Sequence, residues 1–251
     1  MYLPNNMTQT WSIVVFCYNE VETVGKVVTK LVHTFEQHRP GQYEIVIVDD
    51  GSTDGSAGVI HTLTDRFPTV RAVLHEVNQG IGQALRTGYK NARMENLTAV
   101  PADGQFNTDE LIPHLNVAPD SFVSFFRLEN TTYTMARNAL SYANRMVNSW
   151  LLGFELKDVN WVKIYKTADL QALTLEIESS LVESEICAKL LVSGKKVLQV
   201  ESKYYPREAG VSKGASWRIV RQALRDTLTL GAVLRRFRQQ TRVRDRNKVL
   251  S

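Results

Sequence analysis

Two carboxylates at the end of an apolar run are the strongest candidates for ligand binding in this chain. Residues 43–48 are rich in Ile and Val, which is typical of a buried strand. Asp49 and Asp50 follow directly, and Gly51 then allows a turn into residues 52–54, which are good helix N-caps. In an open parallel sheet, ligands bind just beyond the carboxyl ends of the strands. We therefore interpret this pair as well placed to hold a sugar nucleotide.

A tyrosine and a glutamate follow a second apolar run, residues 12–17, and would lie at the same edge of such a sheet. The ring of Tyr18 can cover a planar base, and the carboxylate of Glu20 can accept hydrogen bonds from ribose hydroxyls or base N–H groups. The alternative is that Asn19 and Glu20 only begin the helix that follows.

Two glycines precede a further predicted helix, and such a helix N-terminus can cradle a phosphate. They are Gly80 and Gly82. The segment is not the dinucleotide-binding fingerprint, because Leu85 stands where the third glycine should be. A lone Gly-x-Gly is weak evidence for a site.

An aspartate and a glutamine follow the predicted strand at residues 97–100. Asp103 and Gln105 could supply two oxygen ligands to a divalent cation, which would neutralise the charge of a departing nucleoside diphosphate. The alternative is an ordinary turn, because Asp-Gly is a good turn dipeptide.

A late loop carries two cations and a hydroxyl close to a glycine, and this set suits a segment that closes over a diphosphate. The residues are Arg207, Ser212 and Lys213. Surface Arg and Lys are more often simply solvated, so the loop alone leaves both roles open.

The elements that must position these groups alternate along the first hundred residues. Hydrophobic periodicity predicts strands at residues 12–17, 44–48, 70–75 and 97–100, with helices at 20–37, 54–66 and 82–95 between them. This order predicts an α/β fold with a mostly parallel sheet and helices on both faces. Beyond Asp103 we predict a short helix at 109–114, strands at 121–126, 162–165 and 196–200, and helices at 134–152, 180–192 (capped by Gly194) and 217–237. We expect one domain over residues 10–215 and a basic helical extension over 216–251.

Size and composition indicate an ordinary globular protein. The chain has 251 residues, 43% hydrophobic and 22% charged. No run approaches the roughly 20 apolar residues of a membrane span. The N-terminus lacks the regions of a signal peptide, and two cysteines, Cys17 and Cys187, cannot form a disulfide framework. We therefore expect a cytoplasmic protein.

Positive charge gathers near the C-terminus. Between Arg235 and Lys248 there are seven basic residues and one acidic residue, Asp245. The segment is either a solvated helix end or tail, or a surface attracted to anionic lipid at roughly 1 kcal/mol per basic residue. We do not expect this segment to bind nucleic acid, because its basic residues are not interspersed with aromatic ones and no recognised nucleic-acid-binding motif accompanies them.

Together these segments resemble glycosyltransferase family 2, with its GT-A fold and Rossmann-like nucleotide half. Within the family, the chain is most similar to the polyprenol-phosphate sugar synthases of the dolichol-phosphate mannose synthase type. The resemblance runs from about Ser12 to Lys213. It is carried by residues 48–54, 103–105, 158–165 and 207–213, and by Glu185, nine residues before Gly194.

The resemblance implies a role for each matching position. The nucleoside pocket would be lined by Phe16, Tyr18, Glu20, Asp49 and Asp50, with Gly80 close to the nucleotide. Mg²⁺ or Mn²⁺ and the diphosphate would face Asp103 and Gln105. The phosphates would be covered by Arg207, Ser212 and Lys213, and the acceptor side would hold Asp158 and Glu185.

We expect an inverting transfer from a UDP- or GDP-sugar to a polyprenyl phosphate, by a peripheral enzyme at the inner face of a membrane. The family's usual Asp-x-Asp is altered, because Pro101 replaces the first aspartate and offers no side-chain ligand. The pair of C-terminal membrane helices found in some relatives is also missing. No residue is a convincing general base; Asp158 is the best candidate and Glu129 the next. A phosphate acceptor needs no base, which favours the lipid phosphate.

Two alternatives remain open. One is transfer to a saccharide hydroxyl during surface polysaccharide assembly, although the Gln-x-x-Arg-Trp motif of processive synthases is absent. The other is a catalytically impaired subunit that binds a nucleotide sugar, which the Pro101 replacement suggests.

Overall fold

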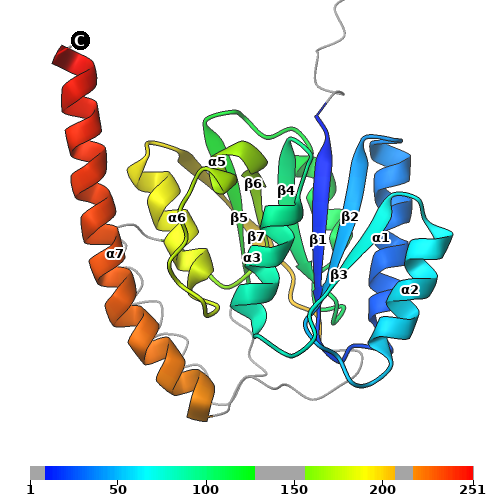
Figure 1. Cartoon of the computed structure of the whole chain (residues 1–251). Helices are drawn as coiled ribbons and strands as arrows, with labels where there is room; N and C mark the ends of the chain where they lie inside the picture. Colours follow the sequence, from blue (N-terminus) through cyan, green and yellow to red (C-terminus); the bar gives the residue numbers. More distant parts are fainter. Residues whose placement is uncertain (1–8, 128–155, 207–216, 251) are drawn as a thin grey trace, which may run out of the picture.

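A seven-stranded sheet forms the centre of the computed structural model, with helices on both faces (Figure 1). The structure describes residues 9–127, 156–206 and 217–250; within the last stretch, side chains are described at 225–227 and 229–243. The strands are β1 (Trp11–Cys17), β2 (Tyr43–Asp49), β3 (Val70–Leu74), β4 (Asn96–Pro101), β5 (Ser121–Arg127), β6 (Lys163–Lys166) and β7 (Lys196–Ser202). The helices are α1 (Val24–His38), α2 (Ser56–Arg66), α3 (Ile81–Asn91), η1 (Thr108–His114), α5 (Thr167–Gln171), α6 (Val182–Val192) and α7 (Trp217–Leu250).

The strand order is β3-β2-β1-β4-β6-β5-β7. β6 runs antiparallel to both of its neighbours, and the other pairs are parallel, so the predicted mostly parallel sheet is confirmed. At the end of β1, Cys17 pairs with Asp49 of β2 and Phe16 pairs with Pro101 of β4. The three strands therefore end level, and the residues that follow them meet at one edge.

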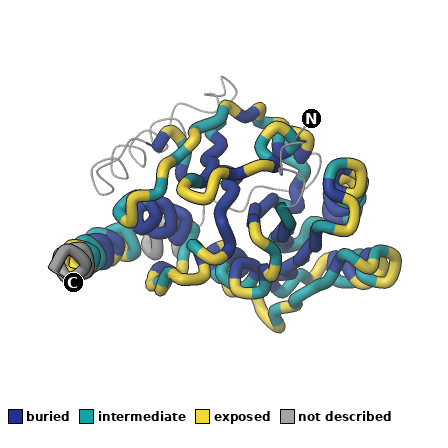
Figure 2. Tube along the Cα trace, turned by 90° about the horizontal axis from the view of Figure 1, so that it is seen from above, coloured by how far each residue is buried: buried dark blue, intermediate teal, exposed yellow. Residues whose placement is uncertain are grey.

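Each face of the sheet has its own apolar core, because successive residues of a strand point to opposite faces. Ile13 and Val15 of β1 belong to the cluster that includes residues of α1, α2 and η1. Val14 belongs to the cluster that includes residues of α3, α5 and α6. Figure 2 shows the buried segments in the middle of the molecule and exposed ones around them.

Most predicted elements appear with shifted ends. Helix α1 begins at Val24 instead of residue 20, because residues 20–23 form a turn in which Glu20 O accepts from the N–H groups of Thr23 and Val24. Helix α3 ends at Asn91, four residues before the predicted end. Gly194 has φ +85° and caps α6 as predicted. The short helix α5 was not predicted, and the helix predicted at 134–152 lies outside the described residues.

Helix α7 is longer than predicted. It continues to Leu250, thirteen residues beyond the amphipathic segment predicted at 217–237 and within the basic helical extension expected over 216–251. In Figure 1 it lies beside α6, begins at the end of the molecule where β1 and β2 end, and runs past the opposite end of the sheet. Leu230 and Leu234 are buried in the same cluster as α6, while the domain division at residue 215 stays a prediction. No helix within the described residues combines the length and apolar character that a membrane span requires.

Candidate functional site

The turns after β1 and β2 are tied to each other by polar contacts. The N–H of Asn19 donates to Ser52 Oγ at 2.8 Å, and Asn19 Oδ1 accepts from the N–H of Thr53 at 2.7 Å. The N–H of Glu20 donates to Ser56 Oγ at 3.0 Å. Asn19 adopts φ +55°, a conformation that asparagine tolerates. These two residues therefore build the turn, and neither begins α1.

The predicted nucleoside-pocket residues do gather at this edge. Phe16 lines the cavity described below, and Tyr18 and Glu20 are half-buried at the end of β1. The Glu20 carboxylate accepts from the hydroxyl of Thr23 at 3.3 Å. The carboxylate of Asp49 is buried and accepts from the N–H and the hydroxyl of Ser52, so it serves its own turn.

Asp50 is held by three donors. Its Oδ1 accepts from His75 Nδ1 at 2.7 Å and from the N–H of Gln79 at 2.9 Å, and its Oδ2 accepts from the N–H of Gly80 at 2.8 Å. A buried carboxylate needs such partners. Because the Gly80 N–H is bound to Asp50, it does not form the phosphate cradle that the sequence suggested.

Two glycines bring neighbouring segments together. A Cβ at Gly51 would lie 2.5 Å from the carbonyl carbon of Val77, and φ there is +70°, so the turns after β2 and β3 touch. A Cβ at Gly82 would lie 2.0 Å from Glu178 O. The second glycine of the Gly-x-Gly segment therefore allows α3 to pack closely on residues 178–179.

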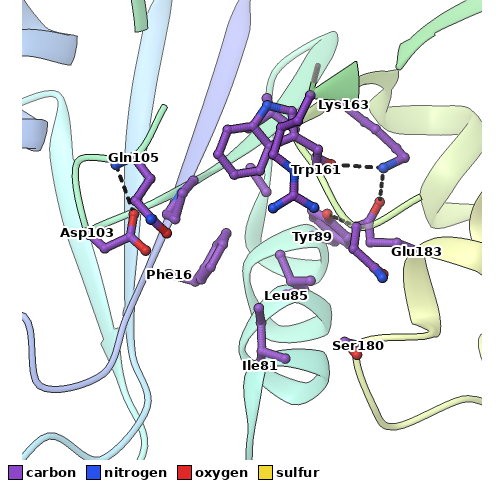
Figure 3. Close-up of a pocket in the computed structure, with 15 residues that line it drawn as sticks. Phe16, Ile81, Leu85, Tyr89, Asp103, Gln105, Trp161, Lys163, Ser180 and Glu183 are labelled. Carbon is purple, nitrogen blue, oxygen red and sulfur yellow. Dashed lines mark hydrogen bonds and ion pairs between the residues drawn. The ribbon is translucent and has the colours of Figure 1, made fainter. Parts of the chain in front are cut away.

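A cavity of about 230 Å³ opens beside the end of β4 (Figure 3). Its apolar wall includes Phe16, Ile81, Leu85, Ala99, Pro101 and Trp161. Its polar lining includes Asp103, Gln105, Arg127, Asn160, Lys163 and Glu183. In Figure 3, Asp103 and Gln105 lie on one side of the cavity, and Tyr89 and Glu183 lie on the other. A ligand there would contact both charge signs.

Asp103 and Gln105 lie together, as predicted. Asp103 Oδ1 accepts from the N–H of Gln105 at 3.0 Å, and the Gln105 side-chain amide donates to the hydroxyl of Tyr204. The backbone also pairs, since the N–H of Tyr205 donates to Gln105 O at 3.2 Å. The chain that leads to residue 207 is therefore anchored beside Asp103. Arg207, Ser212 and Lys213 themselves lie outside the described residues.

The donor set at this turn suits a hard divalent cation. Mg²⁺ is usually held in proteins by one or two carboxylates together with substrate phosphates and water. Asp103 supplies one carboxylate and Gln105 one amide oxygen, and Pro101 lies in the cavity wall without a ligand atom. Within the part of the chain that is described, no group of three or more His, Cys, Asp and Glu side chains forms a metal site by itself. The residues thus fit an ion that the diphosphate helps to hold.

The sequence interpretation missed a cation in the cavity. Arg127, at the end of β5, is bound by both carboxylate oxygens of Asp158, at 2.8 and 3.4 Å. Its guanidinium lies 4.6 Å from the ring centroid of Trp161 and 5.7 Å from that of Tyr204. Asp158 is therefore paired with a cation that lines the cavity, and its acceptor-side role stays a prediction. A carboxylate in such an ion pair is a poor general base.

A second missed group is a buried pair at the back of the cavity. Lys163 Nζ donates to the carbonyls of Val159 and Trp161, both at 2.8 Å, and lies 3.7 Å from Glu183. The Glu183 carboxylate accepts from the hydroxyls of Tyr89 and Tyr165. Burial, followed by the charge of Glu183, raises the pKa of Tyr89 well above 10. Burial also raises the pKa of Tyr165, so both phenols stay protonated and keep donating.

Glu185 is not at the cavity. Its side chain is fully buried, accepts from the N–H groups of Glu176 and Ile177 at 2.9–3.0 Å, and pairs with Lys189 at 2.6 Å. Two residues along a helix correspond to a rotation of about 200°, so Glu183 and Glu185 point to opposite sides of α6. The resemblance implied an acceptor-side role for Glu185, but the α6 carboxylate that lines the cavity is that of Glu183.

Comparison with known proteins shows to which protein family the chain belongs. The model of the family described as "Glycosyl transferase family 2" matches residues 12–165. That is more than half of the chain, and the chain belongs to glycosyltransferase family 2.

Its relatives include enzymes with lipid-linked substrates in their names. The undecaprenyl-phosphate 4-deoxy-4-formamido-L-arabinose transferase of Edwardsiella ictaluri is 26% identical over 80% of this chain and 62% of its own length. The dolichol-phosphate mannosyltransferase of Mycosarcoma maydis is 29% identical over 47% of this chain and 41% of its own length. The chain thus spans less than two thirds of both. The undecaprenyl-phosphate mannosyltransferase of Micrococcus luteus is 24% identical over 78% of this chain and 84% of its own length.

Solved structures confirm the GT-A fold. Mannosyl-3-phosphoglycerate synthase of Rubrobacter xylanophilus matches with a TM-score of 0.65 at 19% identity, over 93% of this chain and 75% of that one. Glucosyl-3-phosphoglycerate synthase of Mycobacterium tuberculosis, in complex with UDP, matches with a TM-score of 0.63 at 16% identity, over 92% and 85%. At these identities the likeness establishes the fold alone.

Proposed function

We propose that the protein transfers a sugar, with inversion, from a UDP- or GDP-sugar to a polyprenyl phosphate. The observation that carries this proposal is the cavity beside Asp103, which is lined by Arg127 and Lys163. Each of these cations is paired with a carboxylate, Asp158 or Glu183, and an acceptor that is itself an anion would share their N–H donors.

On the donor side, the nucleoside would lie over the edge formed by Tyr18, Glu20 and Asp50, with the diphosphate near Asp103 and Gln105. A divalent ion bound there would neutralise the charge that develops on the leaving diphosphate. Arg207, Ser212 and Lys213 would complete the phosphate contacts. This assignment follows the family resemblance and the anchoring of residues 204–205 to Gln105.

On the acceptor side, neither Asp158 nor Glu183 is an uncommitted base, which favours a phosphate nucleophile; Glu129 lies outside the described residues. Asp158 is bound to Arg127, and both oxygens of Glu183 accept hydrogen bonds from tyrosines. A phosphate monoester is already anionic and attacks without losing a proton. A sugar hydroxyl would need a base within hydrogen-bond reach.

The second candidate is transfer to a saccharide hydroxyl, and one observation favours it. Glu183 is a carboxylate that lines the cavity, and it would become a base if an acceptor hydroxyl displaced one of its tyrosine partners. The third candidate is a catalytically impaired subunit. The reason to consider it is that Pro101 replaces the first aspartate of the family's Asp-x-Asp and offers no side-chain ligand to a metal ion.

Transfer of labelled sugar separates these candidates. We expect label from a UDP- or GDP-sugar, with Mn²⁺, to enter the lipid fraction when polyprenyl phosphate is the acceptor. A Glu183→Gln variant should keep this transfer within about threefold, whereas loss of a general base costs roughly 10²–10⁴-fold. Label found only in saccharide acceptors would contradict the lipid-phosphate proposal. Nucleotide binding without transfer to either acceptor would support the impaired subunit.

A basic helix surface would bring the protein to its acceptor. Arg235 and Arg242 on α7 are exposed, and further basic residues follow to Lys248. We propose that α7 binds anionic lipid at the inner face of the membrane, as amphipathic basic helices do.

Vesicle sedimentation tests this proposal. Exchanging Arg235, Arg238 and Arg242 for glutamine should weaken binding to vesicles with 30% anionic lipid by roughly tenfold or more, since each basic residue contributes about 1 kcal/mol. The same three changes should leave binding to neutral vesicles unaltered. Equal binding of wild type to neutral and anionic vesicles would argue against an electrostatic attachment.

A further inference from the structure

The carboxylate of Asp50 is connected to helix α3 through a histidine. Nδ1 of His75 lies 2.7 Å from Asp50 Oδ1, and its Nε2 lies 3.0 Å from Thr87 Oγ1 in the middle of α3. The side chains of His75 and Asp50 are only 8% and 4% exposed. Both ring nitrogens are thus engaged, and the imidazole is fixed in one orientation.

The direction of these hydrogen bonds follows from the acceptor. Oδ1 of Asp50 already accepts from the N–H of Gln79 and can only accept from the ring, so Nδ1 of His75 carries a proton. In the neutral ring Nε2 then accepts from the hydroxyl of Thr87, and in the charged ring it donates to that hydroxyl. Either way, His75 donates to Asp50.

The sequence places His75 where it can do this. It is the first residue after β3, and its N–H donates to Asp49 O at 2.8 Å, which extends the pairing of β2 and β3 by one residue. The turn that follows is fastened to the same carboxylate through Gln79 and Gly80. Val77 in that turn touches Gly51, so the two turns form one unit around Asp50.

These three donors leave the carboxylate of Asp50 little capacity to accept further hydrogen bonds. A carboxylate has about four acceptor positions. Donors from the described residues use two of these positions on Oδ1 and one on Oδ2, which leaves one position on Oδ2 for a ligand. A single base N–H would fill it. The rotation of the carboxylate about its Cβ–Cγ bond then decides where that position points, and His75 fixes this rotation.

We propose that His75 is a positioning residue for the donor, which orients Asp50 toward the nucleobase and holds the residue 77–80 turn against it. This inference rests on the proposed function, since it takes a nucleotide sugar as the donor. His75 itself is expected to contact Asp50 and Thr87 and to make no contact with the diphosphate.

The test compares a ligand that has a base with one that has none. Titration calorimetry with Mg²⁺ would measure the binding of UDP, GDP and inorganic pyrophosphate to the full chain. His75→Ala should weaken binding of the preferred nucleoside diphosphate about tenfold, the effect of one hydrogen bond to a charged group, and change pyrophosphate binding less than twofold. In turnover assays, the KM of the donor should rise by a similar factor while kcat changes little.

Conservative and control variants make the result specific. His75→Asn keeps an N–H donor near the position of Nδ1 and should restore nucleotide binding to within about threefold of wild type. Thr87→Val removes only the hydroxyl at Nε2 and should weaken binding about threefold, which keeps the test usable if His75→Ala does not fold. His61→Ala changes an exposed histidine of α2 and should have no effect.

The outcomes are distinguishable. Unchanged nucleotide binding in His75→Ala and Thr87→Val would overturn the inference, and so would an equal loss of nucleotide and pyrophosphate binding, which indicates general damage to the edge. Wild-type protein that binds neither UDP nor GDP would instead overturn the proposed function, whatever the variants do.

Discussion

Exchanging Asp103 for asparagine is expected to lower turnover by at least a hundredfold while the fold stays intact. The carboxylate lies just after the end of β4 and lines the cavity on the side of Gln105, opposite Glu183, where a divalent ion would meet the leaving diphosphate. Removing a group that stabilises developing charge costs roughly 10²–10³-fold in kcat. Initial rates at saturating donor with Mn²⁺ would measure the loss, and chelation with EDTA should reduce the wild type to a similar level.

Asp109→Asn is the matched control for this experiment. Asp109 lies in η1, six residues further on, is 48% exposed, and pairs with Lys30 at 2.9 Å. Surface ion pairs of this kind contribute about 0–1 kcal/mol, so the control should keep full activity and a nearly unchanged melting temperature. If Asp103→Asn were as active as the control, the result would contradict the proposal that Asp103 faces the metal ion and the diphosphate.

Exchanging Glu185 for alanine is expected to destabilise the protein by about 3–5 kcal/mol, the cost of breaking a buried ion pair from one side. The change leaves the ammonium of Lys189 buried without its partner and removes the acceptor for the N–H groups of Glu176 and Ile177. Urea unfolding followed by circular dichroism would measure the loss.

Glu201→Ala changes an exposed glutamate of β7 and should alter stability by less than about 0.5 kcal/mol. Where Glu185→Ala remains folded at low temperature, its KM for the acceptor should match that of the wild type. A stable variant with a raised KM for the acceptor would instead restore the role that the family resemblance implied for Glu185.

The donor half of the site could be predicted from the sequence because its strands are simple. β1, β2 and β4 are short runs of mostly apolar residues, covered on both faces, and each ends in residues that cannot continue a buried strand. Parallel strands place all such ends at one edge, so Phe16, Asp50 and Asp103 could be brought together without knowledge of the strand order.

The acceptor half could not be predicted in this way. Arg127 ends β5 and Lys163 begins β6, and these positions share an edge only because β6 runs antiparallel between β4 and β5. Neither hydrophobic pattern nor spacing reports the direction of a four-residue strand. The sequence did place both cations close to the ends of predicted strands. That observation points to a shared site only once the direction of β6 is known.

The length of α7 was missed for a different reason. Its last turns contain Arg, Gln, Lys and Val with no apolar stripe, and a search for amphipathic periodicity stops where that stripe stops. Arg, Gln and Lys nevertheless have high helix propensity, and no glycine or proline interrupts the segment. Intrinsic propensity was therefore a better guide than periodicity beyond Phe237.

The course of α7 also constrains how the molecule can rest on a bilayer. Its 34 residues correspond to a rod of about 50 Å, which begins at the end of the molecule where β1 and β2 end, runs beside α6, and carries its arginine-rich last turns past the opposite end of the sheet. A flat surface that touched only those last turns would lie at the opposite end of the molecule from Asp50 and Asp103, which follow the ends of β2 and β4. If the proposed attachment to anionic lipid and the proposed lipid-phosphate acceptor both hold, the bilayer must therefore run alongside the rod, so that the arginines and the edge that carries Asp103 face the same surface.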